Sequence, residues 1–355
     1  MKKLPNLDFV RFLLASLVVL THVHLISNSL GLPSYSNLPV FNKGHEAVYM
    51  FFVLSGFLIV KIIYTEKQND SFSIKKFYIR RILRIFPLYY LIIFIGFVFY
   101  NFVLPKLGVF HEIDYNLLDG VLLTCFFLPN VFTVLYDGGA IIEILWSLGI
   151  EEQFYLIIAP LIYFVPKRKV FQFILSFTIL YFIIFHLDVI PFLQKYNFLY
   201  FYLFFGGVIS ILENKKKLNF LKTNKVIPLV IVFFTIIYYT TDFFEFANQF
   251  IKNLVSCILL SLFVHTISYN NFGIEVKSKI FNYFGRISFG IYMYHIIVIY
   301  GVLFVSLKIN QLKIFNDIIL ICLINISTFV FTILISHFSY KYFEKPFLKL
   351  KTKFR

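Results

Sequence analysis

The sequence predicts an all-α membrane protein, a polytopic bundle of about ten transmembrane helices with the N- and C-termini in the cytoplasm. Of its 355 residues, 59% are hydrophobic and only 14% are charged, and the mean hydropathy is +0.82. A water-soluble globular protein does not normally reach these values. Apolar runs long enough to cross about 30 Å of hydrocarbon lie at residues 7–26, 46–64, 87–104, 146–165, 170–187, 198–212, 226–241, 251–268, 284–307 and 317–340.

One further apolar stretch, residues 117–135, is interrupted by Pro129 and Asn130. An eleventh crossing here would move every later loop to the opposite side of the membrane and place most of the later basic residues outside. The sequence therefore predicts a re-entrant or surface segment at this place.

The distribution of Lys and Arg fixes the predicted orientation. With the N-terminus inside, most of the 33 basic residues fall in segments on the cytoplasmic side, as the positive-inside rule requires. The net charge of +15 is then explained by topology and by contact with an anionic lipid bilayer, so no nucleic-acid partner is predicted. The basic residues outside those segments and the first span are Lys43, Lys106, Lys195, Lys252, Lys308 and Lys313.

The first span is predicted to be a retained helix, because Asp8 and Arg11 interrupt its apolar run and no small-residue cleavage site follows. The three cysteines stand apart in apolar surroundings, so neither a disulfide framework nor a metal site is expected. We expect residues 1–345 to form an integral membrane domain and residues 346–355 a basic cytoplasmic tail.

Arg11 and His22 are the first candidate site residues. At about 100° per residue they share one face of the first helix and lie roughly 16 Å apart along its axis. Arg11 is costly in a membrane unless something compensates its charge, although its side chain can also snorkel to the headgroups. His22 lies deeper and has the alternative of a plain hydrogen bond to another helix.

Arg81 and Arg84 enter the third span from the cytoplasmic side. Three residues apart on a helix, two guanidinium groups can grip one polyphosphate. An ordinary positive-inside anchor is the alternative, and Arg80 is expected to point to the surface. No Gly-rich phosphate loop is present.

Two more motifs carry polar groups into the bundle. Trp146, Ser147 and Glu151 open the fourth span from the outer side, where Glu151 either complements the helix dipole or orients a buried imidazole. Tyr292 and His295 follow Ser288 on one stripe of the ninth span, where helix packing is the alternative to a site. The full motifs are Trp146–Leu156 and Gly285–His295.

With these motifs in order, the chain resembles the membrane-bound acyltransferase family three, the O-acyltransferases of envelope polysaccharides and related molecules. Two features depart from the family pattern: Ala47-Val48-Tyr49 stands where an acidic residue is common, and Phe289 stands where Tyr is commoner. The family's extracytoplasmic esterase-like domain, present in some members, is also not expected. The matching elements are Arg11 with His22, Phe51–Ile59, Arg81 with Arg84 and Pro87, Trp146–Leu156, Ser288–His295, and Glu344–Phe347.

The resemblance implies a multi-pass protein of a bacterial-type inner membrane that transfers an acyl group, expected to be acetyl, from cytoplasmic acyl-CoA to a hydroxyl of a carbohydrate or glycolipid acceptor outside. It needs no permanently bound cofactor. The expected catalytic residues are His22, Glu151 and Arg11, with His22 as general base or acyl carrier. Arg81, Arg84 and Arg11 are expected to bind the donor, and Trp146, Ser147, Tyr292 and His295 to line the substrate side. The alternative function is a polytopic transporter of an anion or a lipid-linked sugar.

Overall fold

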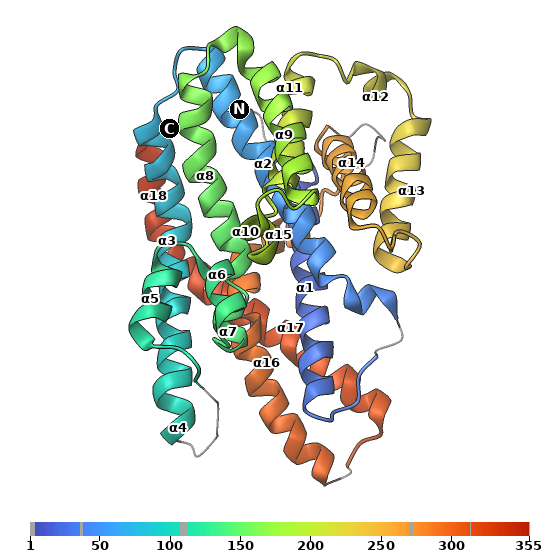
Figure 1. Ribbon diagram of the computed structural model, residues 1–355. Helices are drawn as coiled ribbons and strands as arrows, with labels where there is room; N and C mark the ends of the chain where they lie inside the picture. Colours follow the sequence, from blue (N-terminus) through green and yellow to red (C-terminus); the bar gives the residue numbers. More distant parts are fainter. Residues whose placement is uncertain are drawn as a thin grey trace. The chain divides into compact units, whose positions relative to one another are not determined.

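The computed structural model describes residues 4–35, 38–106, 113–269, 273, 275–312 and 314–354, and all regular structure in them is helical (Figure 1). The all-α prediction is confirmed, and each of the ten predicted apolar segments coincides with helix. Within these described residues, seven helical segments are long and apolar enough to cross a membrane, and α11 (Tyr200–Asn214) and α13 (Val226–Thr240) are shorter apolar helices. The chain is thus a multi-pass membrane protein. The count of ten and the side of the termini stay predictions.

The chain divides into two compact units, each assembled from separate stretches of sequence. Unit 1 comprises Met1–Phe51, Asn219–Lys252 and Leu262–Phe343, and unit 2 comprises Phe52–Leu218, Asn253–Ser261 and Glu344–Arg355. Helices α2 (Gly44–Gln68) and α14 (Gln249–Ser268) contribute residues to both. The predicted division at residue 345 stays a prediction.

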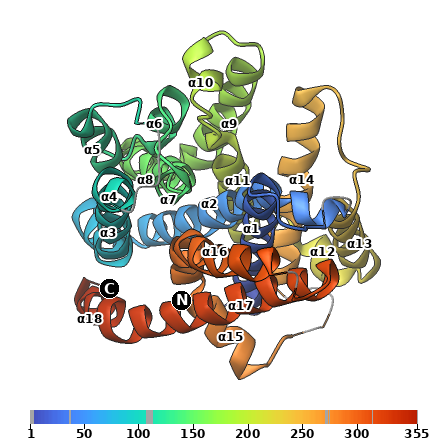
Figure 2. The same ribbon diagram turned by 90° about the horizontal axis from the view of Figure 1, so that it is seen from below.

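Unit 1 is built around α1, which contacts α15, α16 and α17 (Figure 2). A Cβ atom on Gly285 would lie 1.8 Å from the backbone oxygen of Asp8, so only glycine allows the end of α15 to touch the start of α1 so closely. α16 and α17 also pack against each other. The helices of unit 1 are α1 (Leu7–Ser29), α12 (Asn219–Thr223), α13, α15 (Lys279–Arg286), α16 (Ser288–Gln311) and α17 (Asp317–Phe338), with the short helix η1 (Pro39–Asn42) and the π-helical turn η4 (Ser339–Glu344).

A cluster of charged side chains ties distant parts of unit 1 together. The Lys43 Nζ atom lies 2.6 Å from one carboxylate oxygen of Glu245, and the Lys252 Nζ atom lies 2.6 Å from the other. Lys252 also lies 3.9 Å from Glu46. Burial lowers the pKa of Lys43, but the hydrogen bond to Glu245 and the charges of the neighbouring carboxylates together outweigh burial and leave that pKa above its ordinary value. The cluster therefore joins the start of α2 to the connection between α13 and α14, on the side predicted to face outward.

Unit 2 depends on a close crossing of α2 and α11. A Cβ atom on Gly56 would lie 1.8 Å from the backbone oxygen of Leu203, and one on Gly206 would lie 2.0 Å from that of Val53. The two backbones therefore touch. The other helices of unit 2 are α3 (Ile74–Val98), α4 (Leu104–Lys106), α5 (Leu117–Cys125), α6 (Pro129–Leu135), α7 (Ala140–Glu143), α8 (Trp146–Phe164), α9 (Val170–His186), α10 (Pro191–Lys195) and α18 (Lys345–Lys351), with η2 (Phe99–Val103), η3 (Lys167–Lys169) and η5 (Thr352–Phe354).

The third predicted span begins earlier than hydropathy indicated. The prediction placed its start at residue 87, whereas α3 begins at Ile74, capped by the Ser73 side chain accepting from the Lys76 N–H. The basic residues of this stretch interrupt apolarity but are good helix formers, so the helix runs through them. Pro87 lies inside α3.

The interrupted stretch 117–135 forms two short helices, α5 and α6, of nine and seven residues. Neither is long enough to cross a bilayer, as predicted. Phe127 between them has φ 60°, and Pro129 begins α6, a position that suits a residue without an N–H.

The surface assignment of Arg80 was wrong. Arg80 is only 8% exposed, and its Nη2 donates to both carboxylate oxygens of Glu66 at 3.0 Å. Its Nη1 donates to the backbone oxygen of Phe354 at 3.1 Å. Because α18 packs on α3, the segment predicted to be a basic tail covers the face on which Arg80 lies.

Candidate active site

His22 lies beside a second histidine in unit 1. The Nδ1 atom of His22 is 2.9 Å from the backbone oxygen of Val18 and 3.2 Å from Nε2 of His295. Nδ1 of His295 hydrogen-bonds the backbone oxygen of Tyr292. His295 is fully buried, whereas His22 is half-buried. The structure thus joins two predicted site residues, one from α1 and one from α16.

These contacts decide which ring nitrogens carry hydrogen. A carbonyl oxygen only accepts, so Nδ1 is the N–H donor in both His22 and His295. In each neutral ring, Nε2 then carries the lone pair. Nε2 of His295 therefore accepts from Nδ1 of His22, whose N–H is shared with the oxygen of Val18. His22 is the more accessible of the two rings, and its Nε2 atom carries the lone pair that can accept a proton.

Arg11 has a charge partner on its own helix. Its Nη1 atom lies 3.1 Å from a carboxylate oxygen of Asp8, one turn earlier on α1. The side chain of Arg11 is 19% exposed and that of Asp8 is 9% exposed. This pair compensates the intramembrane charge that made Arg11 costly. Because α1 is a continuous helix from Leu7 to Ser29, Arg11 and His22 share a face as predicted.

Glu151 belongs to a hydrogen-bonded group in unit 2. The Ser55 hydroxyl donates to Glu151 Oε2 at 2.7 Å, and the Tyr155 hydroxyl donates to the same oxygen. Ser55 comes from α2, whose tight crossing at Gly56 fixes its place, and the two other residues come from α8. The predicted action of Glu151 on His22 stays a prediction.

Arg81 extends this group toward the start of α3. Its guanidinium lies 5.9 Å from the ring centres of Phe77 and Tyr155. Arg81 and Arg84 both interact electrostatically with Glu151. Arg84 is exposed and Arg81 is partly exposed. Of the two residues, Arg84 is therefore the more exposed.

Glu152, the neighbour of Glu151, is a buried carboxylate for which the sequence predicted no site role. It is 5% exposed, and its Oε1 atom has no hydrogen-bond partner within the described part of the chain. It interacts electrostatically with Arg81. Of the other candidates in unit 2, Ser147 is buried, and the ring of Trp146 packs edge-on against Phe52 at 5.9 Å.

The sequence indicated the pairing of Asp8 with Arg11, because a carboxylate three residues before an intramembrane Arg is suited to neutralise its charge. Ser55 stands within the motif Phe51–Ile59, and Tyr155 within Trp146–Leu156, but nothing in either motif says which side chains meet. The approach of His295 to His22 had no signal beyond the occurrence of both histidines in motifs.

Comparisons with known proteins agree with this set of motifs. A family model described as an acyltransferase domain matches residues 4–337. The peptidoglycan O-acetyltransferase OatA of Listeria monocytogenes is 31% identical over 165 residues, which is 44% of this chain and 24% of OatA. The putative peptidoglycan O-acetyltransferase YrhL of Bacillus subtilis is 33% identical over 125 residues, covering 33% of this chain and 19% of YrhL.

An uncharacterized protein of Haemophilus influenzae is 36% identical over 128 residues, or 34% of this chain and 49% of that protein. The matched regions thus span about half or less of these relatives. No solved structure matches the chain. Because the family model covers nearly the whole sequence, the chain belongs to this family of acyltransferases.

Proposed function

We propose that this protein is an O-acetyltransferase that moves an acetyl group from cytoplasmic acetyl-CoA to a hydroxyl of a carbohydrate acceptor outside the membrane. The observation that carries the proposal is the His22–His295 pair, which leaves a basic nitrogen on the more accessible ring. Membership of the acyltransferase family and the names of two relatives support it. Those names make peptidoglycan the first acceptor to test.

The donor is held through its phosphates. Arg81 and Arg84 present two guanidinium groups at the end of α3 predicted to face the cytoplasm, where acyl-CoA is made. Guanidinium forks bind phosphate oxygens with two hydrogen bonds each. Arg80 takes no part in this, because Glu66 and the Phe354 backbone oxygen occupy its guanidinium.

His22 supplies the base for transfer. The acceptor oxygen attacks the thioester carbonyl carbon, its proton passes to Nε2 of His22, and the carbon–sulfur bond breaks as the carbon–oxygen bond is completed. The proton then leaves His22 for the thiolate, which gives free CoA. His295 accepts the Nδ1–H bond that strengthens while His22 is positively charged. A positioned base is worth about 10² to 10⁴ in rate.

Two of the remaining candidates have supporting parts in this proposal. Arg11, whose charge is neutralised by Asp8, places a polar group on the same face of α1 as His22. Glu151 fixes the hydroxyls of Ser55 and Tyr155, and through the Tyr155 ring it sets the place of Arg81. An acyl group carried on His22 is the alternative route, and rapid-quench trapping of enzyme incubated with labelled acetyl-CoA separates the two.

The test uses the full chain in lipid nanodiscs with acetyl-CoA and a soluble peptidoglycan fragment. We expect release of CoA thiol together with a fragment heavier by one acetyl group, and loss of both in His22→Ala. His186→Ala is the matched control, because His186 is a half-buried imidazole with the same bond to the backbone oxygen four residues earlier. Full activity of His22→Ala would exclude His22 as base or carrier. Uptake of the fragment into sealed proteoliposomes without CoA release would indicate the transporter.

A further inference from the structure

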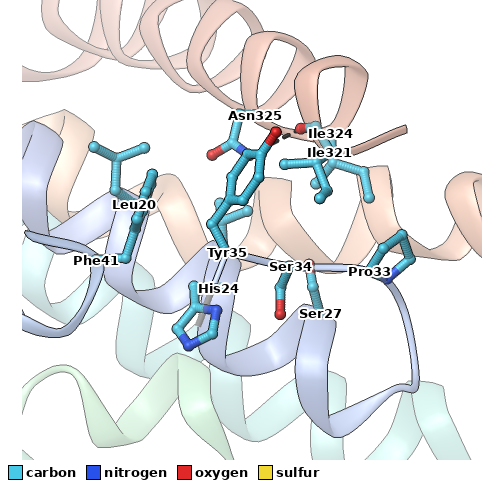
Figure 3. A pocket seen from close by; sticks show the side chains of 11 residues that line it. Leu20, His24, Ser27, Pro33, Ser34, Tyr35, Phe41, Ile321, Ile324 and Asn325 are labelled. Atoms are coloured by element: carbon cyan, nitrogen blue, oxygen red, sulfur yellow. Dashed lines mark hydrogen bonds between the residues drawn. The ribbon is translucent and has the colours of Figure 1, made fainter. Parts of the chain in front are cut away.

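A small pocket lies in unit 1 at the end of α1 predicted to face outward. Side chains of α1, of the segment after it and of α17 line it (Figure 3). The enclosed space has room for about one water-sized group. The lining residues are Leu20, Val23, His24, Ser27, Pro33, Ser34, Tyr35, Phe41, Ile321, Ile324 and Asn325.

Three polar atoms in this lining are buried and lack a hydrogen-bond partner within the described residues. They are Nδ1 of His24, Oγ of Ser27 and Oδ1 of Asn325. His24 is only 7% exposed and Ser27 only 2%. The amide nitrogen of Asn325 already donates to the backbone oxygen of Ile321, so its oxygen is the atom left to be satisfied. Buried polar groups are almost always paired with protein, water or ligand. Such a concentration in one cavity therefore indicates an occupant.

The lining defines the chemistry of that occupant. It contains no Lys, Arg, Asp or Glu, so it offers no counter-charge to an ionic ligand. The amide oxygen of Asn325 needs a donor, whereas Ser27 and His24 can donate or accept. A neutral hydroxyl supplies both. The rings of Tyr35 and Phe41 stack beside the pocket with centroids 6.1 Å apart, and aromatic faces beside hydrogen-bonding groups suit a sugar.

The pocket lies on a different face of α1 from His22. At about 100° per residue, the side chains of Leu20, Val23, His24 and Ser27 centre on a direction roughly 150° away from that of His22. A helix with its side chains is about 10–12 Å across. A hydroxyl in the pocket is therefore separated from Nε2 of His22 by about that width, which exceeds one sugar ring.

The geometry points to an accessory carbohydrate subsite, in which His24, Ser27 and Asn325 hold a hydroxyl of a sugar unit neighbouring the one acetylated. This inference rests on the proposed function and extends it to the length of the acceptor. A single sugar cannot reach both places, whereas a glycan of several units can. A remote contact that is equally strong in the ground state and the transition state lowers KM and leaves kcat unchanged.

The test compares N-acetylglucosamine with a tetrasaccharide cut from peptidoglycan as acceptors, using the full chain in nanodiscs. We expect Ser27→Ala and Asn325→Leu each to raise KM for the tetrasaccharide about three- to tenfold, the effect of one lost hydrogen bond. The KM for N-acetylglucosamine and kcat should not change. Thr332→Val is the matched control, because Thr332 is another buried hydroxyl of α17 unpartnered within the described residues, and it does not line the pocket.

If Ser27→Ala and Asn325→Leu leave the KM of both acceptors as it is in the original enzyme, the pocket holds only water and the inference is overturned. A rise for N-acetylglucosamine as large as for the tetrasaccharide would overturn it too, because the pocket would then hold the reacting sugar. Calorimetric binding of the tetrasaccharide to His22→Ala, with and without Asn325→Leu, separates the two proposals. An affinity about three- to tenfold weaker on Asn325→Leu supports the subsite whatever His22 does, and unchanged affinity refutes the subsite alone.

Discussion

Replacing His295 tests how much its hydrogen bond to His22 contributes to catalysis. In His295→Leu the ring that accepts from Nδ1 of His22 is lost, but the Val18 oxygen at 2.9 Å still accepts from the same N–H. His22 therefore keeps its tautomer and loses one hydrogen bond made while it is charged. Hydrogen bonds to charged groups are worth about 1.5–3 kcal/mol, so we expect kcat to fall about 10- to 150-fold.

The conservative variant His295→Gln separates this role from packing. A glutamine amide reaches roughly as far as Nε2 of a histidine and offers an acceptor oxygen there. We expect it to restore kcat to within about fivefold of the original enzyme, if it regains most of the energy of that bond. The assay is CoA thiol release at saturating acetyl-CoA. Thermal unfolding accompanies it, because His295 is fully buried.

Two results would refute this reasoning. Equal activity of His295→Leu and the original enzyme would show that the 3.2 Å contact contributes nothing to catalysis. A loss near 10⁴-fold in both variants would match the loss of a tautomer-fixing group, and would mean that the Val18 oxygen does not hold the ring as inferred.

Further predictions concern donor binding and stability. Arg84→Ala should raise KM for acetyl-CoA about tenfold or more through loss of a charge-assisted contact. Arg80→Gln should lower thermal stability and leave that KM unchanged, because Arg80 pairs with Glu66. An equal rise in KM for both variants would contradict the assignment. Gly56→Ala should destabilise the protein by about 1–3 kcal/mol through overpacking against Leu203. Gly301→Ala, inside α16 and with nothing within 4 Å of its Cβ, should instead stabilise it by up to about 1 kcal/mol; unfolding in detergent measures both. Burial raises the pKa of Glu245, but the hydrogen bonds and the positive charges of Lys252 and Lys43 together outweigh burial and hold that pKa below its ordinary value. The extra stability over Glu245→Gln should therefore be full above about pH 5 and disappear as the pH falls through that lowered pKa; a difference independent of pH would contradict the cluster.

The sequence predicted the class of fold and the positions of the apolar helices because both depend on local composition. It placed the start of α3 too late, since hydropathy marks where lipid begins and not where helical hydrogen bonding begins. It assigned Arg80 to the surface for a related reason. The partners of Arg80 are Glu66 and the backbone of Phe354, and a helix wheel contains no information on a segment 274 residues away.

The candidate site was predictable as a set of residues but not as a set of contacts. His22, Arg81 and Glu151 stand in motifs with recognisable spacing. That His22 meets His295, and that Glu151 meets Ser55 and Tyr155, depends on how separate helices cross. Gly56 and Gly285 control two such crossings, yet a glycine in a sequence does not reveal which backbone it touches.

The ion pair of Asp8 and Arg11 has a consequence for how the protein is made. The α-helices that pack on α1 within unit 1, α15 to α17, begin at Lys279, so they are synthesised long after α1 must enter the membrane. Arg11 brings its counter-charge along, three residues away on the same helix. The first helix can therefore be inserted with its charge compensated and wait in the lipid until its neighbours emerge from the ribosome. Removing Asp8 would make insertion of the first helix into the membrane less favourable.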